Sequence, residues 1–61
     1  MKQFNIIIEG APATIWVDGD TLTVVFEDGT KERYYNPERT ERNGQTVREW
    51  KIRDDVTIKL M

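Results

Sequence analysis

Alternation of apolar and polar residues with a period of two is the feature that most constrains this chain. Phe4, Ile6 and Ile8 fall on one side of an extended segment, and the same spacing recurs over residues 22–26 and 56–60. The 3.6-residue period of an amphipathic helix is not sustained over any comparable length. The sequence therefore predicts an all-β protein built from short antiparallel strands.

The alternation and the glycines between its runs suggest where the strands begin and end. We expect strands over residues 4–17, 21–27, 31–35, 46–53 and 56–61. The first should bend near Gly10 and Pro12, because glycine tolerates distortion and proline cannot donate to a ladder. Turns are expected where glycine follows Asp or Asn, since glycine readily takes positive φ. These dipeptides are Asp18-Gly19, Asp28-Gly29 and Asn43-Gly44.

The expected length of two turns sets the register of the strands around them. A three-residue loop ending at Gly29 would place Leu22 beside Tyr34 and would turn Lys31 and Arg33 outward. At Asn43-Gly44, a two-residue loop would set Arg39 against Arg48 and Glu38 against Glu49. Like charges directly opposite one another repel, so a three-residue loop that faces Glu38 with Arg48 is favoured here as well.

Residues 36–44 allow two interpretations. Asn36, Pro37, Glu38 and Gly44 match the capping positions of a helix of about two turns. However, residues 37–43 contain no apolar side chain that could dock such a helix. An extended hairpin arm and a short helical turn near residues 37–43 therefore both remain open.

Five to six short strands in 61 residues predict a single domain, residues 1–61, folded as a small antiparallel β-barrel of the OB-like or SH3-like kind. Closure into a barrel would remove the exposed strand edges of so small a sheet. The predicted core consists of Phe4, Ile6, Ile8, Ile15, Val17, Leu22, Val24, Phe26, Tyr34, Trp50, Ile52, Val56, Ile58 and Leu60.

Composition limits the chemistry that this chain can perform. It has no His and no Cys, which excludes imidazole acid–base catalysis, thiol chemistry, disulfides and Cys/His zinc sites. The adjacent Asp54 and Asp55 are expected to form a turn rather than a catalytic carboxylate pair. We therefore expect no catalytic residues, no metal, no cofactor and no enzyme activity. No apolar run is long enough to cross a bilayer, so we expect a cytoplasmic protein without membrane contact.

Charge is distributed unevenly along the chain. Residues 1–30 hold one Lys and five acidic residues, whereas residues 31–53 hold seven basic and four acidic residues. In the expected register, cations and aromatic rings converge on the outer face of the barrel. The candidate binding residues on this face are Trp16, Arg33, Tyr35, Lys51 and Arg53. Exposed rings beside cations can stack single-stranded bases or anchor a protein partner.

Val17-Asp18-Gly19-Asp20-Thr21 resembles the V-D-G-D-T motif of the thermonuclease-type nuclease family, which is built on an OB barrel. The resemblance implies that Asp20 matches the first calcium ligand of that family. Pro37-Glu38 matches the end of its D-x-P-E segment, but Tyr35 stands where the second calcium-binding Asp should be. Loss of an oxygen ligand disfavours a calcium site, so nuclease activity is not expected.

The pattern as a whole resembles an idealised, de novo designed small β-barrel, with regular alternation and Asp-Gly or Asn-Gly turns. This resemblance implies a monomeric scaffold that has no natural biochemical activity and requires no partner. The alternative is a small natural binding module, for example a phage-encoded one. Such a module would engage a protein or, ranked after it, single-stranded nucleic acid through the outer aromatic and basic face.

Overall fold

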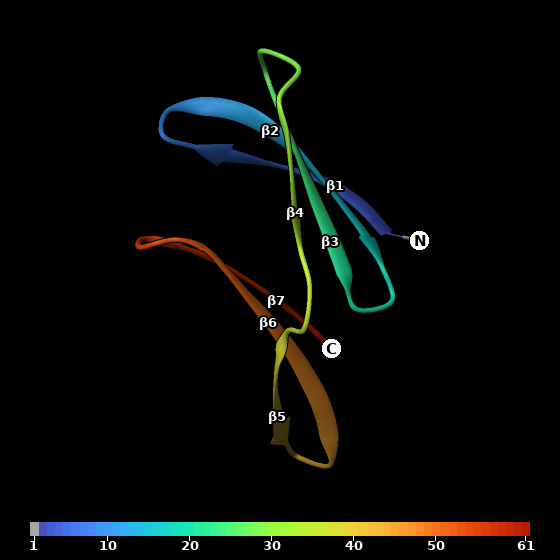
Figure 1. Cartoon of the computed structure of the whole chain (residues 1–61). Helices are drawn as coiled ribbons and strands as arrows, with labels where there is room; N and C mark the ends of the chain where they lie inside the picture. Colours follow the sequence, from blue (N-terminus) through green and yellow to red (C-terminus); the bar gives the residue numbers. More distant parts are fainter. Residues whose placement is uncertain (1) are drawn as a thin grey trace.

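The computed structural model describes residues 2–61, which form seven antiparallel strands and no helix. In chain order these are β1 (Lys2–Ile8), β2 (Ala11–Asp18), β3 (Thr21–Phe26), β4 (Lys31–Tyr34), β5 (Glu38–Arg42), β6 (Gln45–Arg53) and β7 (Val56–Leu60). Figure 1 shows them in two sheets, one ordered β1-β2-β3-β4 and the other β5-β6-β7. The predicted all-β, antiparallel class is confirmed.

The prediction of a closed barrel with five to six strands is wrong. Within residues 2–61 no ladder connects the four-stranded sheet to the three-stranded one, so an OB-like or SH3-like barrel is not formed. The chain leaves the first sheet directly after β4, where Asn36 takes a left-handed φ of 53°. This turn directs β5 away from β4, and β5 begins a second sheet instead of extending the first.

The first predicted strand is in fact a hairpin. Ile8 pairs with Ala11, and the two residues between them have positive φ, 51° at Glu9 and 79° at Gly10. Positive φ at both central residues is the signature of a type I′ turn, which reverses the chain rather than bending it. Pro12 is accommodated because its nitrogen faces away from β1, toward the side where β3 has already ended at Phe26.

The predicted register between β3 and β4 is confirmed. Leu22 faces Tyr34, and the Gly29 backbone N–H donates to the Phe26 carbonyl at 3.0 Å. The Phe26 N–H donates to the Thr30 carbonyl at 2.8 Å, and Gly29 has a φ of 90°. A three-residue loop with a left-handed glycine therefore joins these strands, as the sequence indicated.

The segment between β4 and β6 is extended, which decides between the hairpin and the helical turn in favour of the hairpin. The predicted three-residue loop is wrong, because Arg42 pairs with Gln45 across the two residues Asn43 and Gly44. Their φ values of 53° and 79° make this another type I′ turn, for which Asn-Gly is a strongly preferred pair.

This register places Arg39 opposite Arg48 and Glu38 opposite Glu49, the pairs that repulsion was expected to exclude. The like charges are compensated by groups outside the hairpin. Arg39 forms an ion pair with Asp20 of the other sheet, and Glu49 faces Lys59 on β7. The repulsion expected from the sequence was too large, because the hairpin's own cross-strand pairs are only part of the charges that surround Arg39 and Glu49.

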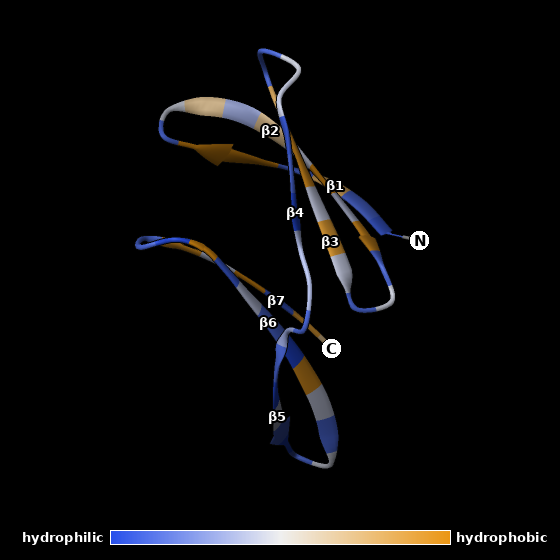
Figure 2. Cartoon of the chain, viewed as in Figure 1, coloured by the Kyte–Doolittle hydropathy of each residue, from blue (hydrophilic) through white to orange (hydrophobic). Residues whose placement is uncertain are grey.

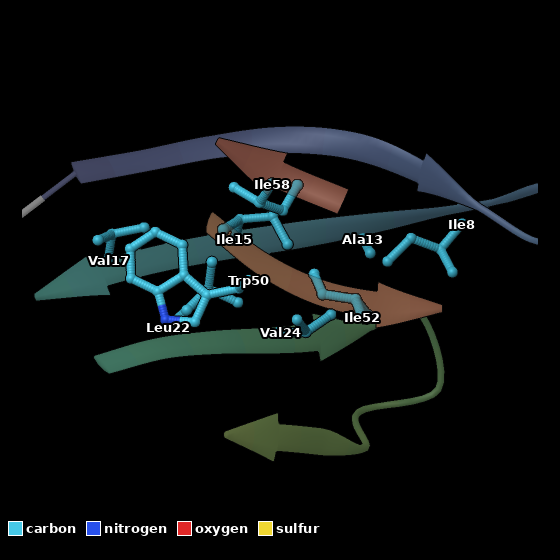
Figure 3. Close-up of a cluster of buried hydrophobic side chains, with 9 residues drawn as sticks. All are labelled: Ile8, Ala13, Ile15, Val17, Leu22, Val24, Trp50, Ile52 and Ile58. Atoms are coloured by element: carbon cyan, nitrogen blue, oxygen red, sulfur yellow. The ribbon is translucent and has the colours of Figure 1, made fainter. Parts of the chain in front are cut away.

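The core lies between the two sheets, and apolar positions alternate with polar ones along strands such as β3 (Figure 2). Trp50 and Ile52 of β6 point toward the side chains of β2 and β3 (Figure 3). Every predicted core residue is buried in this cluster or packed against it, so the core prediction is confirmed, and Ala13 is an additional member. The buried members are Ile8, Ala13, Ile15, Val17, Leu22, Val24, Trp50, Ile52 and Ile58.

Candidate binding surfaces

The side of the four-stranded sheet that faces away from the core carries a row of three residues. Trp16 pairs with Thr23, and Thr23 pairs with Arg33 on the next strand. Trp16 is 37% exposed, although both of its chain neighbours, Ile15 and Val17, are buried. Thr23, which lies between the indole and the guanidinium, is small and half-buried.

Neighbouring rows extend this surface. Thr14 pairs with Val25 and Val25 with Lys31 on one side of the Trp16 row. On the other side Tyr35 follows directly after β4 and is 60% exposed. We call this surface the outer sheet face, and its members are Gln3, Asn5, Ile7, Thr14, Trp16, Asp18, Thr21, Thr23, Val25, Lys31, Arg33 and Tyr35. The second sheet packs against the opposite face and leaves this one open.

The cations of the outer sheet face are not neutralised within the part of the chain that the structure describes. Among residues 2–61, the ion pairs involve only two cations, Arg39 and Arg53. Arg39 pairs with Asp20, and Arg53 pairs with Glu9 and Glu32. Lys31 and Arg33 have no carboxylate at ion-pair distance and are exposed. The outer sheet face therefore combines exposed aromatic rings with Lys31 and Arg33, which have no ion-pair partner among residues 2–61, and with the carboxylate of Asp18 opposite Thr21.

Lys51 belongs to a different surface from the one predicted. It lies on β6 opposite Thr57 and is exposed on the outer side of the three-stranded sheet. Lys51 and Tyr35 line the same hollow of about 230 Å³, beside the β4–β5 connection at Asn36 and Pro37. The structure thus brings Tyr35 and Lys51 together but separates Lys51 from Trp16 and Arg33.

Arg53 does not lie on the expected outer face. A bulge between Lys51 and Arg53 shifts the register of β6, so the alternation that predicted an outward side chain fails there. The Arg53 guanidinium lies over the Phe26 ring, 5.4 Å from its centroid. Its Nη1 is 3.1 Å from Glu32 Oε1, and its Nε is 3.7 Å from Glu9 Oε1.

Arg53, Glu32 and Tyr34 form a connected polar network at one end of the core. Tyr34 donates its hydroxyl proton to Glu32 Oε1 at 2.7 Å, and Arg53 donates to the same oxygen. These hydrogen bonds, led by that from Tyr34, lower the pKa of the Glu32 carboxyl below its usual value. Burial, followed by the hydrogen bond to Glu32, raises the pKa of the Tyr34 phenol.

This network borders an open cleft of about 620 Å³ whose apolar wall includes Ile8, Ala11 and Phe26. Sequence reasoning did not single out Glu9 or Glu32. A signal for Glu32 was present, however, because in the confirmed register it faces the inward Val24 and occupies a core-side position. A carboxylate at such a position needs a partner, and Arg53 supplies it.

The residues that resemble the nuclease motif form the turn between β2 and β3. Asp18 pairs with Thr21, and Gly19 has a positive φ of 61°. The Asp20 carboxylate is paired with Arg39, and the Gly19 carbonyl accepts a hydrogen bond from Arg48. Over residues 2–61, no group of three acidic side chains is arranged to hold a metal ion.

Asp54 and Asp55 form the turn between β6 and β7, as expected from the sequence. Arg53 and Val56 are the pair that closes this turn. None of residues 2–61 belongs to a helix long and apolar enough to cross a membrane. No protein-family model, no curated protein and no solved structure matches this chain.

Proposed function

We propose that this chain is a non-catalytic binding module that engages a protein partner through its outer sheet face. The observation that carries this proposal is the exposed Trp16 at the middle of an uncovered sheet, with Arg33 one strand beyond its neighbour Thr23. Trp, Tyr and Arg are the residue types that most often dominate the binding energy of protein interfaces. Trp16, Tyr35 and Arg33 supply one of each on this surface.

The charges of the outer sheet face define the chemistry of the partner. Lys31 and Arg33 lack carboxylate partners within the described residues, so a surface bearing Asp or Glu would complement them. Trp16 and Tyr35 would contact the apolar part of the same surface. We therefore propose a protein partner that combines an apolar patch with acidic residues, rather than a nucleic acid.

A designed scaffold without natural activity is the second candidate. It is favoured by the glycines of four turns, all at positive φ, and by the absence of an unsatisfied buried polar side-chain atom among residues 2–61. Against it, Ile7 is 65% exposed and Trp16 and Tyr35 are also exposed. Idealised designs keep such side chains off the surface, so these residues favour a surface with a binding role.

Site-specific photocrosslinking tests the proposal and does not require that the partner be identified first. A photoreactive phenylalanine analogue is placed at Thr23, at the centre of the outer sheet face, and in a matched control at Thr57, on the outer side of the other sheet. After irradiation of producing cells, we expect a discrete protein adduct at Thr23 and none at Thr57. Adding Trp16→Ala and Tyr35→Ala to the Thr23 variant should abolish the adduct.

Two outcomes would overturn the proposal. Equal adducts at Thr23 and Thr57, or none at Thr23, would show that the outer sheet face does not bind a protein. Binding of a labelled single-stranded oligonucleotide that requires Trp16 and weakens steeply with salt would assign the face to nucleic acid instead. A protein contact centred on Trp16 and Tyr35 should depend much less on salt.

A further inference from the structure

Within residues 2–61, four strands have one edge without a strand partner: β1 and β4 in the first sheet, and β5 and β7 in the second. Such an edge presents backbone N–H and C=O groups to which another strand can add. Proteins commonly protect edges with charged side chains, proline, bulges or short strands. Three residues of the four-residue β4 and four residues of the five-residue β5 are charged, and β7 carries Lys59 in its sequence VTIKL.

β1 has fewer of these protective features, because its one charged side chain is Lys2 at the start of the strand. It is seven residues long, and its segment from Gln3 to Ile8 contains no charged residue and no proline. Its pairing with β2 is regular from Lys2 to Ile8, without a bulge. Among the edges that the structure describes, β1 is therefore both the longest and the one least protected against the addition of another strand.

The register of the β1–β2 hairpin identifies the backbone groups that are free on this edge. The closing pair of a two-residue hairpin loop, here Ile8 and Ala11, is hydrogen bonded, and hydrogen-bonded pairs alternate along an antiparallel ladder. Lys2, Phe4, Ile6 and Ile8 therefore direct their N–H and C=O groups to β2. The backbone groups of Gln3, Asn5 and Ile7 point to the open edge.

We propose that this edge binds the β1 strand of a second copy of the chain, in an antiparallel arrangement centred on Asn5. In this register Asn5 faces Asn5 of the second copy, and Gln3 faces Ile7 in the two symmetric hydrogen-bonded pairs. Each copy supplies the same surface, as a two-fold dimer requires. The two four-stranded sheets then form one continuous eight-stranded sheet.

Side chains support a second copy as the occupant in this register. Phe4 faces Ile6 of the second copy in the non-hydrogen-bonded pairs, where side chains lie closest. Both residues are only half-buried in the single chain, so pairing would cover their remaining apolar surface. Lys2 would lie beside the turn that carries Glu9 of the second copy, which adds an opposite-charge contact at each end of the new ladder.

Pairing the two β1 strands in a shifted register matches their side chains less well. Centring the pair on Phe4 sets Lys2 against Ile6 of the second copy and leaves Glu9 beyond the ladder. Centring it on Ile6 sets Gln3 against Glu9 and leaves Lys2 beyond the paired strand. The register centred on Asn5 pairs Phe4 with Ile6 at two symmetric positions and brings Lys2 near Glu9, while Lys2 itself faces Ile8 and Gln3 faces Ile7. It uses the open backbone edge of β1, which borders the outer sheet face at Gln3 and Asn5, and it does not depend on the function proposed above.

Sedimentation equilibrium over a concentration series, up to about 1 mM, tests the association. We expect the wild-type mass to rise from one chain to two. Asn5→Pro removes an N–H that points to the open edge and should weaken association at least about tenfold while keeping the β1–β2 ladder. Lys31→Pro is the matched control, because the Lys31 N–H points to the opposite open edge of the same sheet, and it should leave association unchanged.

Cysteine crosslinking tests the register and remains informative if a proline variant does not fold. The chain has no Cys, so single variants are unambiguous. Asn5→Cys should form a disulfide-linked dimer with itself, whereas Gln3→Cys should crosslink only when mixed with Ile7→Cys. A wild-type mass that stays at one chain throughout would overturn the dimer. Equal self-crosslinking of Asn5→Cys and Gln3→Cys would overturn the register.

Discussion

The indole Nε1 of Trp50 donates a hydrogen bond to the backbone carbonyl of Asp20 at 3.2 Å. This contact joins β6 of one sheet to the β2–β3 turn of the other. The Arg48 guanidinium lies over the Trp50 ring at 5.6 Å and donates to the neighbouring Gly19 carbonyl, and Arg39 pairs with the Asp20 carboxylate. Because no ladder connects the sheets within residues 2–61, such contacts and the shared core hold them together.

Replacement of Trp50 by Ala should therefore be severe. Trp50 is 3% exposed at the centre of the core, so the substitution creates a cavity and should lower the free energy of unfolding by about 3 to 5 kcal/mol. Trp16→Ala, on the open sheet face, should cost about 1 kcal/mol or less. Urea unfolding followed by far-ultraviolet circular dichroism measures both variants. Equal losses would mean that Trp50 does not join the two sheets.

Gly44 should be sensitive to the chirality of its replacement. Its φ of 79° is strained for an L residue but suits a D residue, and a Cβ added there meets no atom within 4 Å. Gly44→Ala should therefore lower the free energy of unfolding by about 1 to 2 kcal/mol, through backbone strain alone. The same chain made by chemical synthesis with D-alanine at position 44 should be at least as stable as the wild type. A similar loss with both enantiomers would contradict the type I′ turn.

The fold class and the core could be predicted from sequence because both follow from side-chain parity. Whichever strands pair with one another, the alternate apolar side chains of residues 4–8, 22–26 and 56–60 have to face inward. The hairpin at Glu9 and Gly10 could not be predicted in this way. Glu is not a typical turn residue, and its left-handed φ is imposed by the pairing of Ile8 with Ala11.

Whether the sheets close into a barrel, and which register β5 and β6 adopt, depend on groups that lie far apart in the sequence. The expected repulsion between Arg39 and Arg48 was offset by Asp20, which lies in the other sheet. Of the candidate site residues, Trp16 and Arg33 lie where parity placed them, because β2 and β4 pair with β3 without a bulge. Arg53 does not, because a bulge interrupts the period-two rule that placed it, and the local sequence gives no sign of this bulge.

The network of Glu32, Tyr34 and Arg53 should make stability depend on pH on the acidic side. The pKa of Glu32 in the folded chain lies below its ordinary value of 4.5, first because of the Tyr34 hydroxyl and then because of Arg53. A carboxyl with a lowered folded-state pKa stabilises the fold fully above its unfolded pKa. This contribution is lost as pH falls through the folded-state pKa, because protonation weakens both hydrogen bonds.

Glu32→Gln isolates this contribution from other carboxyls, such as Asp28, whose pKa is lowered by hydrogen bonds from Thr30. We expect the urea midpoint of Glu32→Gln to lie below that of the wild type above about pH 5, and the two to converge as pH falls toward about 2. The double variant Glu32→Gln/Arg53→Met should show less than the sum of the two single losses, since the residues share one interaction. A difference between wild type and Glu32→Gln that stays constant over this pH range would show that the carboxylate charge does not contribute. Additive losses would show that Arg53 stabilises the fold through Phe26 and Glu9 rather than through Glu32.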